Sequence, residues 1–94
     1  MTEERFDSVW DALENSPAEA MNMKARSDIM IAIRDAVDSW GITQTESAKR
    51  LGITQPRMND LLRGRIDKFS LDALMNLATA AGLTVEWRIG CTAA

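Results

Sequence analysis

The chain contains no histidine, and only one of its 94 residues is a cysteine. A single Cys91 excludes an internal disulfide, and the absence of histidine excludes a metal site built on cysteine and histidine. Catalysis is not expected either, because the sequence shows neither a nucleophile beside a base nor a glycine-rich loop that would cradle a phosphate. We therefore expect no metal, no cofactor and no enzymatic activity.

Long apolar runs are also missing. No stretch is long enough to span a membrane, and the acidic amino terminus does not have the pattern of a secretory signal. With 46% hydrophobic residues, the chain forms one small domain with a thin core, so association with a second copy would add useful burial. We expect a cytoplasmic protein without a membrane partner, and the thin core favours a dimer.

Charge is distributed unevenly along the chain, although its net value is only −3. Residues 43–69 contain six basic and three acidic side chains, whereas residues 1–42 contain four basic and nine acidic ones. A local basic surface is what contact with phosphates requires, while the overall charge mainly governs solubility and non-specific attraction. The acidic remainder lowers non-specific affinity for DNA and leaves charge free for a basic protein partner.

Residues 43–64 hold the most informative motif, TQTESAKRLGITQPRMNDLLRG. Thr43 and Glu46 form a Thr-x-x-Glu capping box, so a helix is expected to begin directly after Thr43. Gly52 ends that helix, because glycine adopts a left-handed backbone without a Cβ penalty. Thr54 caps a second helix, which has a proline in its first turn. The segment therefore predicts two short helices joined by a tight Leu-Gly-Ile turn.

The second of these helices has an apolar and a polar side. At about 100° per residue, Met58, Leu61 and Leu62 share the apolar side. Polar residues on the other side suit base edges, since Asn and Gln pair with adenine, Arg pairs with guanine, and Asp accepts from the cytosine amino group. We assign base reading to Gln55, Arg57, Asn59 and Asp60. The alternative is a plain helical hairpin with a solvated polar face.

A basic loop, Arg63–Lys68, follows the second helix. Arg63, Arg65 and Lys68 are expected to neutralise phosphates at the edge of a groove, and a merely solvated loop is the alternative.

The motif resembles the helix-turn-helix of the lambdoid phage repressor and Cro family, now grouped as the XRE family. The continuation RGRIDKFSLDALMNLATAAGLTVEWRI is similar to the short antitoxin-like (HigA-type) branch of that family, whose members end a compact helical domain with a strand. The likeness covers roughly residues 24–89. It implies that Gln44 bonds a phosphate at the start of the first motif helix and that a carboxylate at Asp60 must find a cytosine amino group or a cationic neighbour. The assigned phosphate contacts are then Gln44, Thr54, Arg63, Arg65 and Lys68.

Two further helices are predicted around the motif. Ser16-Pro17-Ala18-Glu19 is a second capping box, and apolar residues at intervals of four extend a helix from Pro17 to about Ser39, which Gly41 ends. Another amphipathic helix begins after Ser70 and stops near Gly82. Ahead of the long helix, an acidic amphipathic arm carries Phe6, Val9, Trp10 and Leu13. The arm either folds back onto the long helix or docks a partner.

Residues 84–89 alternate polar and apolar side chains of β-favouring types. Their apolar face consists of Val85, Trp87 and Ile89. An isolated strand cannot satisfy its own backbone, and the other predicted elements are helices, so we expect antiparallel pairing with the same strand of a second copy. The alternative is a strand that covers its own subunit or frays.

Together these patterns predict a mainly α protein, a lambda-repressor-like helix-turn-helix bundle with a C-terminal β-strand pairing across a dimer. Residues 1–15 form the arm, 16–83 the helical domain, and 84–94 the dimerisation strand and tail. The homodimer would bind an operator in double-stranded DNA and repress transcription by occupancy. The resemblance implies an autoregulating antitoxin of a type II toxin–antitoxin operon, with a RelE- or HigB-like ribonuclease toxin. A stand-alone phage-type XRE regulator and a toxin-masking protein-interaction module with secondary DNA binding are the alternatives.

Overall fold

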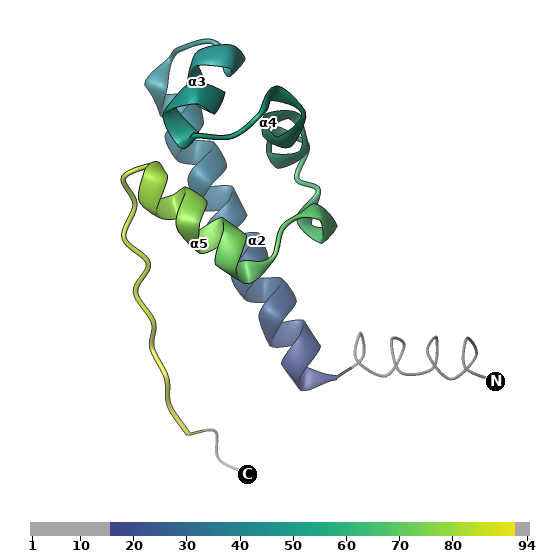
Figure 1. Ribbon diagram of the computed structural model, residues 1–94. Coiled ribbons are helices and arrows are strands. Elements are labelled where there is room, and N and C mark those ends of the chain that lie inside the picture. The colour runs from purple at the N-terminus through teal and green to yellow at the C-terminus, as the bar shows by residue number, and fades with distance from the viewer. Residues whose placement is uncertain (1–15, 92–94) are drawn as a thin grey trace, which may run out of the picture.

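The computed structural model describes residues 16–91, which form four α-helices and one 3-10 turn (Figure 1). In chain order these elements are α2 (Pro17–Trp40), α3 (Gln44–Leu51), α4 (Gln55–Leu62), the 3-10 turn η1 (Ile66–Lys68) and α5 (Leu71–Ala80). The predicted arm from Phe6 to Leu13 lies outside the described residues. Within them, no helix has the length and apolar character needed to cross a bilayer.

The long helix α2 begins at the predicted residue and ends within one residue of the predicted end. The hydroxyl of Ser16 accepts a hydrogen bond from the backbone N–H of Glu19 at 3.1 Å, and Pro17 occupies the first helical position. Gly41 ends the helix in a left-handed conformation with φ of 63°. The helix extends one residue beyond the prediction, to Trp40. Four of its apolar side chains are buried: Ile29, Met30, Ile33 and Val37.

The core lies where α2, α4 and α5 meet. Figure 1 shows α5 crossing the middle of α2, with α3 near the carboxyl end of α2 and α4 to one side. Phe69, which precedes α5, is almost completely buried together with Ile33 and Leu74. Because the core draws on all these elements, the short helices α3 and α4 are fixed by packing rather than by their own helix propensity.

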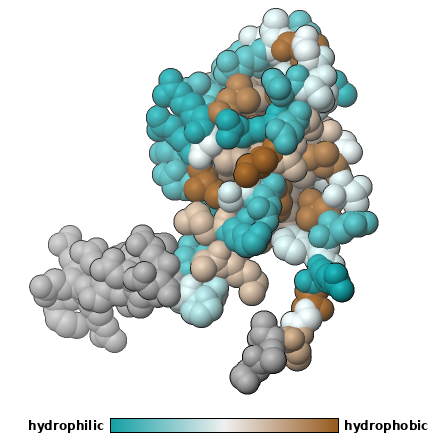
Figure 2. Space-filling model, turned by 180° about the vertical axis from the view of Figure 1, so that it is seen from behind, coloured by the Kyte–Doolittle hydropathy of each residue, from teal (hydrophilic) through white to brown (hydrophobic). Residues whose placement is uncertain are grey.

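The carboxy-terminal segment differs from its prediction. No strand forms within residues 16–91, and residues 83–91 follow α5 as a chain without helix or strand (Figure 1). Val85 packs against the core of its own subunit, whereas Trp87 is 53% exposed and Ile89 is 93% exposed. The expected β-strand is therefore absent from the single chain, because a strand exists only through hydrogen bonds to a neighbouring strand. Figure 2 shows this tail projecting from the body of the molecule.

Candidate nucleic-acid interface

The turn between α3 and α4 is built as the sequence predicts. Thr43 accepts a hydrogen bond from the N–H of Glu46 at 3.1 Å, and Thr54 accepts one from the N–H of Arg57 at 3.3 Å. Between these caps, Gly52 takes a left-handed conformation with φ of 73°, and its N–H and that of Ile53 bond back to the last turn of α3. Two independently capped helices thus cross at a closed turn.

Polar contacts also join the two helices on their outer side. The Gln55 amide donates a hydrogen bond to the hydroxyl of Thr45, so the first residue of α4 is oriented by the first turn of α3. Beneath this contact, Ala48 and Met58 are buried in the shared core. The helix pair therefore presents Gln55 in a set orientation rather than as a freely rotating side chain.

The outer face of α4 contains both free and engaged side chains. Gln55 and Asn59 are exposed, as expected for residues that read bases, whereas Arg57 and Asp60 are half-buried. Both half-buried side chains contact the segment that follows α4. The four predicted base-reading residues therefore lie on one helix, but only two of them, Gln55 and Asn59, are fully accessible to a base.

Arg57 is held by residues at the end of the basic loop. Its guanidinium lies 4.1 Å from the centre of the Phe69 ring and donates a hydrogen bond of 2.6 Å to the backbone oxygen of Lys68. A hydrogen bond from a charged donor contributes about 1.5–3 kcal/mol, and a cation–π contact at a partly exposed site about 0.5–1 kcal/mol more. Arg57 would leave this position only if its contacts with a base edge contributed more free energy than these two contacts do.

Asp60 has the cationic neighbour that a carboxylate beside DNA requires. Its carboxylate lies 3.9 Å from the Arg65 guanidinium, and its backbone oxygen accepts a hydrogen bond from the Arg65 N–H at 3.0 Å. The Arg65 side chain is 48% exposed, so this ion pair contributes at most about 1 kcal/mol and is open to exchange with a phosphate. Asp60 thus connects α4 to the basic loop.

The predicted phosphate-binding residues surround the polar face of α4. Gln44 is exposed at the start of α3, and Arg63, Arg65 and Lys68 are exposed on the loop after α4. Thr54 is exposed too, although its hydroxyl already accepts the capping bond of α4. An exposed polar surface bordered by cations on one side is what a helix docked in a major groove requires.

Two arginines of α2 join this region without any local sequence signal. Arg34 lies beside Gly64, where an added Cβ would come within 3.2 Å of its Nη1 atom. Arg26 donates hydrogen bonds to the backbone oxygens of Ile66 and Phe69 at 3.3 and 3.4 Å. Sequence reasoning missed both residues because they belong to a helix thirty to forty positions earlier, and only the fold brings them to the loop.

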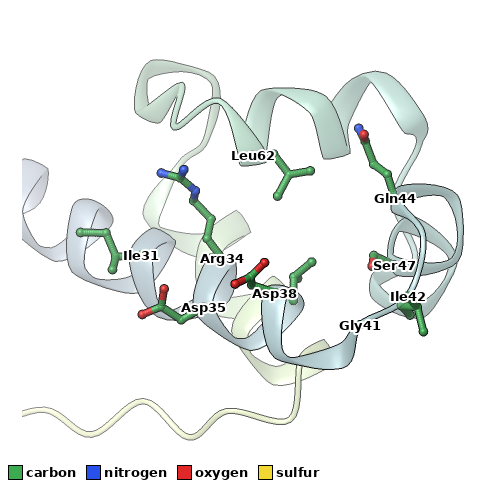
Figure 3. Close-up of a pocket in the computed structure, with 10 residues that line it drawn as sticks. Ile31, Arg34, Asp35, Asp38, Gly41, Ile42, Gln44, Ser47 and Leu62 are labelled. Atoms are coloured by element: carbon green, nitrogen blue, oxygen red, sulfur yellow. The ribbon is translucent and has the colours of Figure 1, made fainter.

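A groove of about 630 Å³ runs beside this surface, between α2, the start of α3 and Leu62 of α4 (Figure 3). Arg34 and Gln44 line it together with the carboxylates of Asp35 and Asp38. The two carboxylates would repel a phosphate, so the groove is not a continuation of the basic surface. The surface suited to DNA is therefore the outer face of α4 with the loop that follows it.

Comparison with known proteins identifies the family of the chain. A family model described as a helix-turn-helix domain matches residues 12–90 of the chain. A solved structure named as an XRE-family transcriptional regulator is similar with a TM-score of 0.72 and 28% sequence identity, over 79% of this chain and 83% of that protein. No curated protein matches the sequence. The chain belongs to the helix-turn-helix domain family of DNA-binding transcriptional regulators.

Proposed function

We propose that the protein represses transcription as a homodimer that places α4 of each subunit in successive major grooves of a pseudo-palindromic operator. The observation that carries this proposal is the exposed pair Gln55 and Asn59 beside the cations of the basic loop. Amide side chains pair with adenine through two hydrogen bonds, while Arg and Lys bind phosphates without regard to sequence. Repression then follows from occupancy of the promoter.

Dimerisation is proposed through the carboxy-terminal tail. Trp87 and Ile89 are largely exposed, and among the described residues no strand pairs with residues 84–89. Antiparallel pairing of two such tails would satisfy both backbones and would cover both apolar faces at once. A two-fold axis between the tails would also match the symmetry of a palindromic operator.

A sharper proposal is that this regulator is the antitoxin of a type II toxin–antitoxin operon. Its support is the resemblance of residues 24–89 to the short antitoxin-like branch, together with the exposed carboxylates of Asp28, Asp35 and Asp38 along α2. A ribonuclease must bind RNA phosphates, so its surface is basic, and an acidic helix complements such a surface.

Selection of bound fragments from the source genome tests both proposals. The purified protein is mixed with sheared genomic DNA, and the retained fragments are sequenced. A repressor of this kind retains a site with two-fold symmetry and half-sites spaced by about 10–10.5 base pairs or a multiple of that spacing. An autoregulating antitoxin retains the region upstream of its own gene, next to a gene for a small basic protein. Uniform retention of all fragments would contradict sequence-specific repression.

A further inference from the structure

Two arginine side chains hold the basic loop Arg63–Lys68 from opposite sides. Arg26 reaches the loop from α2, and Arg57 reaches it from α4. Between them they donate hydrogen bonds to three backbone oxygens in the short stretch from Ile66 to Phe69. These hydrogen bonds from side chains add to the ion pair between Asp60 and Arg65, which also joins the loop to α4.

Arg26 is suited to a structural role. Its side chain is only 13% exposed, and its second terminal nitrogen lies 3.4 Å from the carboxylate of Glu19. A half-buried guanidinium needs partners for its donors, and here the oxygens of Ile66 and Phe69 and one carboxylate accept from its two terminal nitrogens, while Nε has no partner within the described residues. A lysine has no planar fork and cannot reach oxygens of two residues and a carboxylate in this way.

Arg57 fixes the other end of the loop. Its guanidinium covers the ring of Phe69, which is buried in the core, and bonds the oxygen of Lys68. The planar group uses its face for the ring and its edge for the oxygen, a combination that an ammonium group does not reproduce. Because Phe69 is buried in the core, the loop end is tied to the packed interior of the domain.

The loop also has backbone hydrogen bonds of its own, including one from the N–H of Arg65 to the oxygen of Asp60 in α4. It contains the short turn η1, closed by a hydrogen bond of 3.0 Å from the N–H of Lys68 to the oxygen of Arg65. Arg65 and Lys68 are exposed, although Arg65 is paired with Asp60, so a phosphate can reach both side chains. A loop already held in shape loses less conformational entropy when DNA binds, so its cations bind phosphates more tightly.

We propose that Arg26 and Arg57 are positioning residues that hold the basic loop in its phosphate-binding shape, and that Arg57 does not read a base. This inference rests on the proposed function, because it assumes that the loop contacts DNA. Base recognition by α4 then falls to Gln55 and Asn59. The two arginines act on affinity for every DNA sequence, whereas the two amides act on discrimination between sequences.

The test compares Arg57→Lys and Arg26→Lys with Asn59→Ala and with Lys24→Ala, a control that removes an exposed cation of α2 whose ion pair is with Asp28 and not with the loop. Affinities for the selected operator and for a random duplex are measured by fluorescence anisotropy. Both lysine variants should lose roughly 3- to 30-fold on both duplexes, the cost of ordering one or two side chains, with an unchanged operator-to-random ratio. Asn59→Ala should lower that ratio, and Lys24→Ala should leave both affinities nearly unchanged.

Amide hydrogen exchange of the free protein provides the second readout. In both lysine variants, exchange should accelerate at Ile66, Lys68 and Phe69, whose N–H groups are bonded within the loop, and should stay unchanged in α5. A lower operator-to-random ratio for Arg57→Lys, or loop exchange equal to that of the wild type, would overturn the positioning role. If the Arg26→Lys variant does not fold, the Arg57→Lys variant, which changes a half-exposed side chain, tests the positioning role alone. Wild-type protein without DNA affinity would overturn the proposed function and the positioning role together.

Discussion

At the scale of single residues, the outer face of α4 separates side chains that are free to meet DNA from side chains that the chain itself engages. Within residues 16–91, the Asn59 side chain has no hydrogen bond or ion pair and Gln55 is held only through its amide nitrogen, whereas Arg57 and Asp60 are tied to the basic loop. The amide pair therefore has both the chemistry and the access for reading adenine.

Replacing Asn59 or Gln55 by alanine should cost about 1–3 kcal/mol on the operator and should leave binding to random DNA nearly unchanged. Anisotropy titrations on the two duplexes measure both values. Asn76→Ala is a matched control, because Asn76 is an exposed asparagine on α5, away from the proposed interface. Equal losses on operator and random DNA would show that α4 does not read bases.

Phosphate contacts should be visible in the salt dependence of binding. Arg65→Ala and Lys68→Ala should each lower the slope of log affinity against log salt by about one unit, since each removes one contact that releases a counterion. Arg65→Ala should cost more affinity than Lys68→Ala, because it also leaves the carboxylate of Asp60 without its neighbour. Adding Asp60→Asn to Arg65→Ala should recover part of that extra loss. An unchanged slope for either alanine variant would place that side chain in solvent.

The role of Arg57 was not predictable from the sequence. Its position on α4 and its chemistry both matched base reading, and nothing local distinguishes it from Asn59. What separates them is the placement of Phe69 and Lys68, eleven and twelve residues later, which depends on how the loop folds back on α4. The role of Arg26 was even less predictable from the sequence, because the backbone oxygens of Ile66 and Phe69 that it bonds lie 40 and 43 residues later.

At the scale of elements, helix boundaries could be predicted to within one or two residues because their determinants are local. The caps Ser16, Thr43 and Thr54 each accept the expected backbone hydrogen bond, and Gly41 and Gly52 end their helices in left-handed conformations. Such caps depend on three or four consecutive residues and not on the remainder of the fold.

Gly52→Ala should lower the free energy of unfolding by about 1–2 kcal/mol, because alanine pays a steric penalty in the left-handed region. No atom lies within 4 Å of the added Cβ, so the penalty comes from backbone conformation alone. Urea denaturation followed by circular dichroism measures the change. Gly90→Ala, at a position without positive φ and with open space around it, should be neutral. A neutral Gly52→Ala would mean that the turn does not restrict the backbone.

At the scale of the whole molecule, the tail is the element whose structure the sequence alone did not settle. Alternation of apolar residues predicted a strand, but a strand needs a partner that one chain does not contain. The pattern shows which side chains share a face, and in the single chain Val85 turns to its own core while Ile89 is exposed. The dimer therefore stays a proposal that solution measurements must test.

Truncation after Leu83, or Trp87→Asp, should shift the protein from dimer to monomer, since the first removes the pairing segment and the second places like charges near the two-fold axis. Light scattering measures the mass. Operator affinity should fall far more than half-site affinity, because the second half-site is bound intramolecularly only while the subunits are joined. Truncation after Gly90 retains residues 84–89 and should leave the dimer intact. A persistent dimer after Leu83 truncation would move the interface to α2 or the amino-terminal arm.

The half-buried position of Val85 also bears on the distance between the two subunits of a dimer joined through the tails. Because this residue packs on the core only a few positions after α5 ends, the tail leaves each subunit from a set point and not from a flexible tether. In a dimer joined through the tails, the separation of the two α4 helices is then determined by which residues pair across the axis. Since strand side chains alternate with a period of two, one residue inserted between Val85 and Trp87 would reverse the apolar face, whereas two would preserve it and move the subunits apart. In such a dimer, the spacing between the two operator half-sites would depend on the length of the tail and not on the residues proposed to contact DNA.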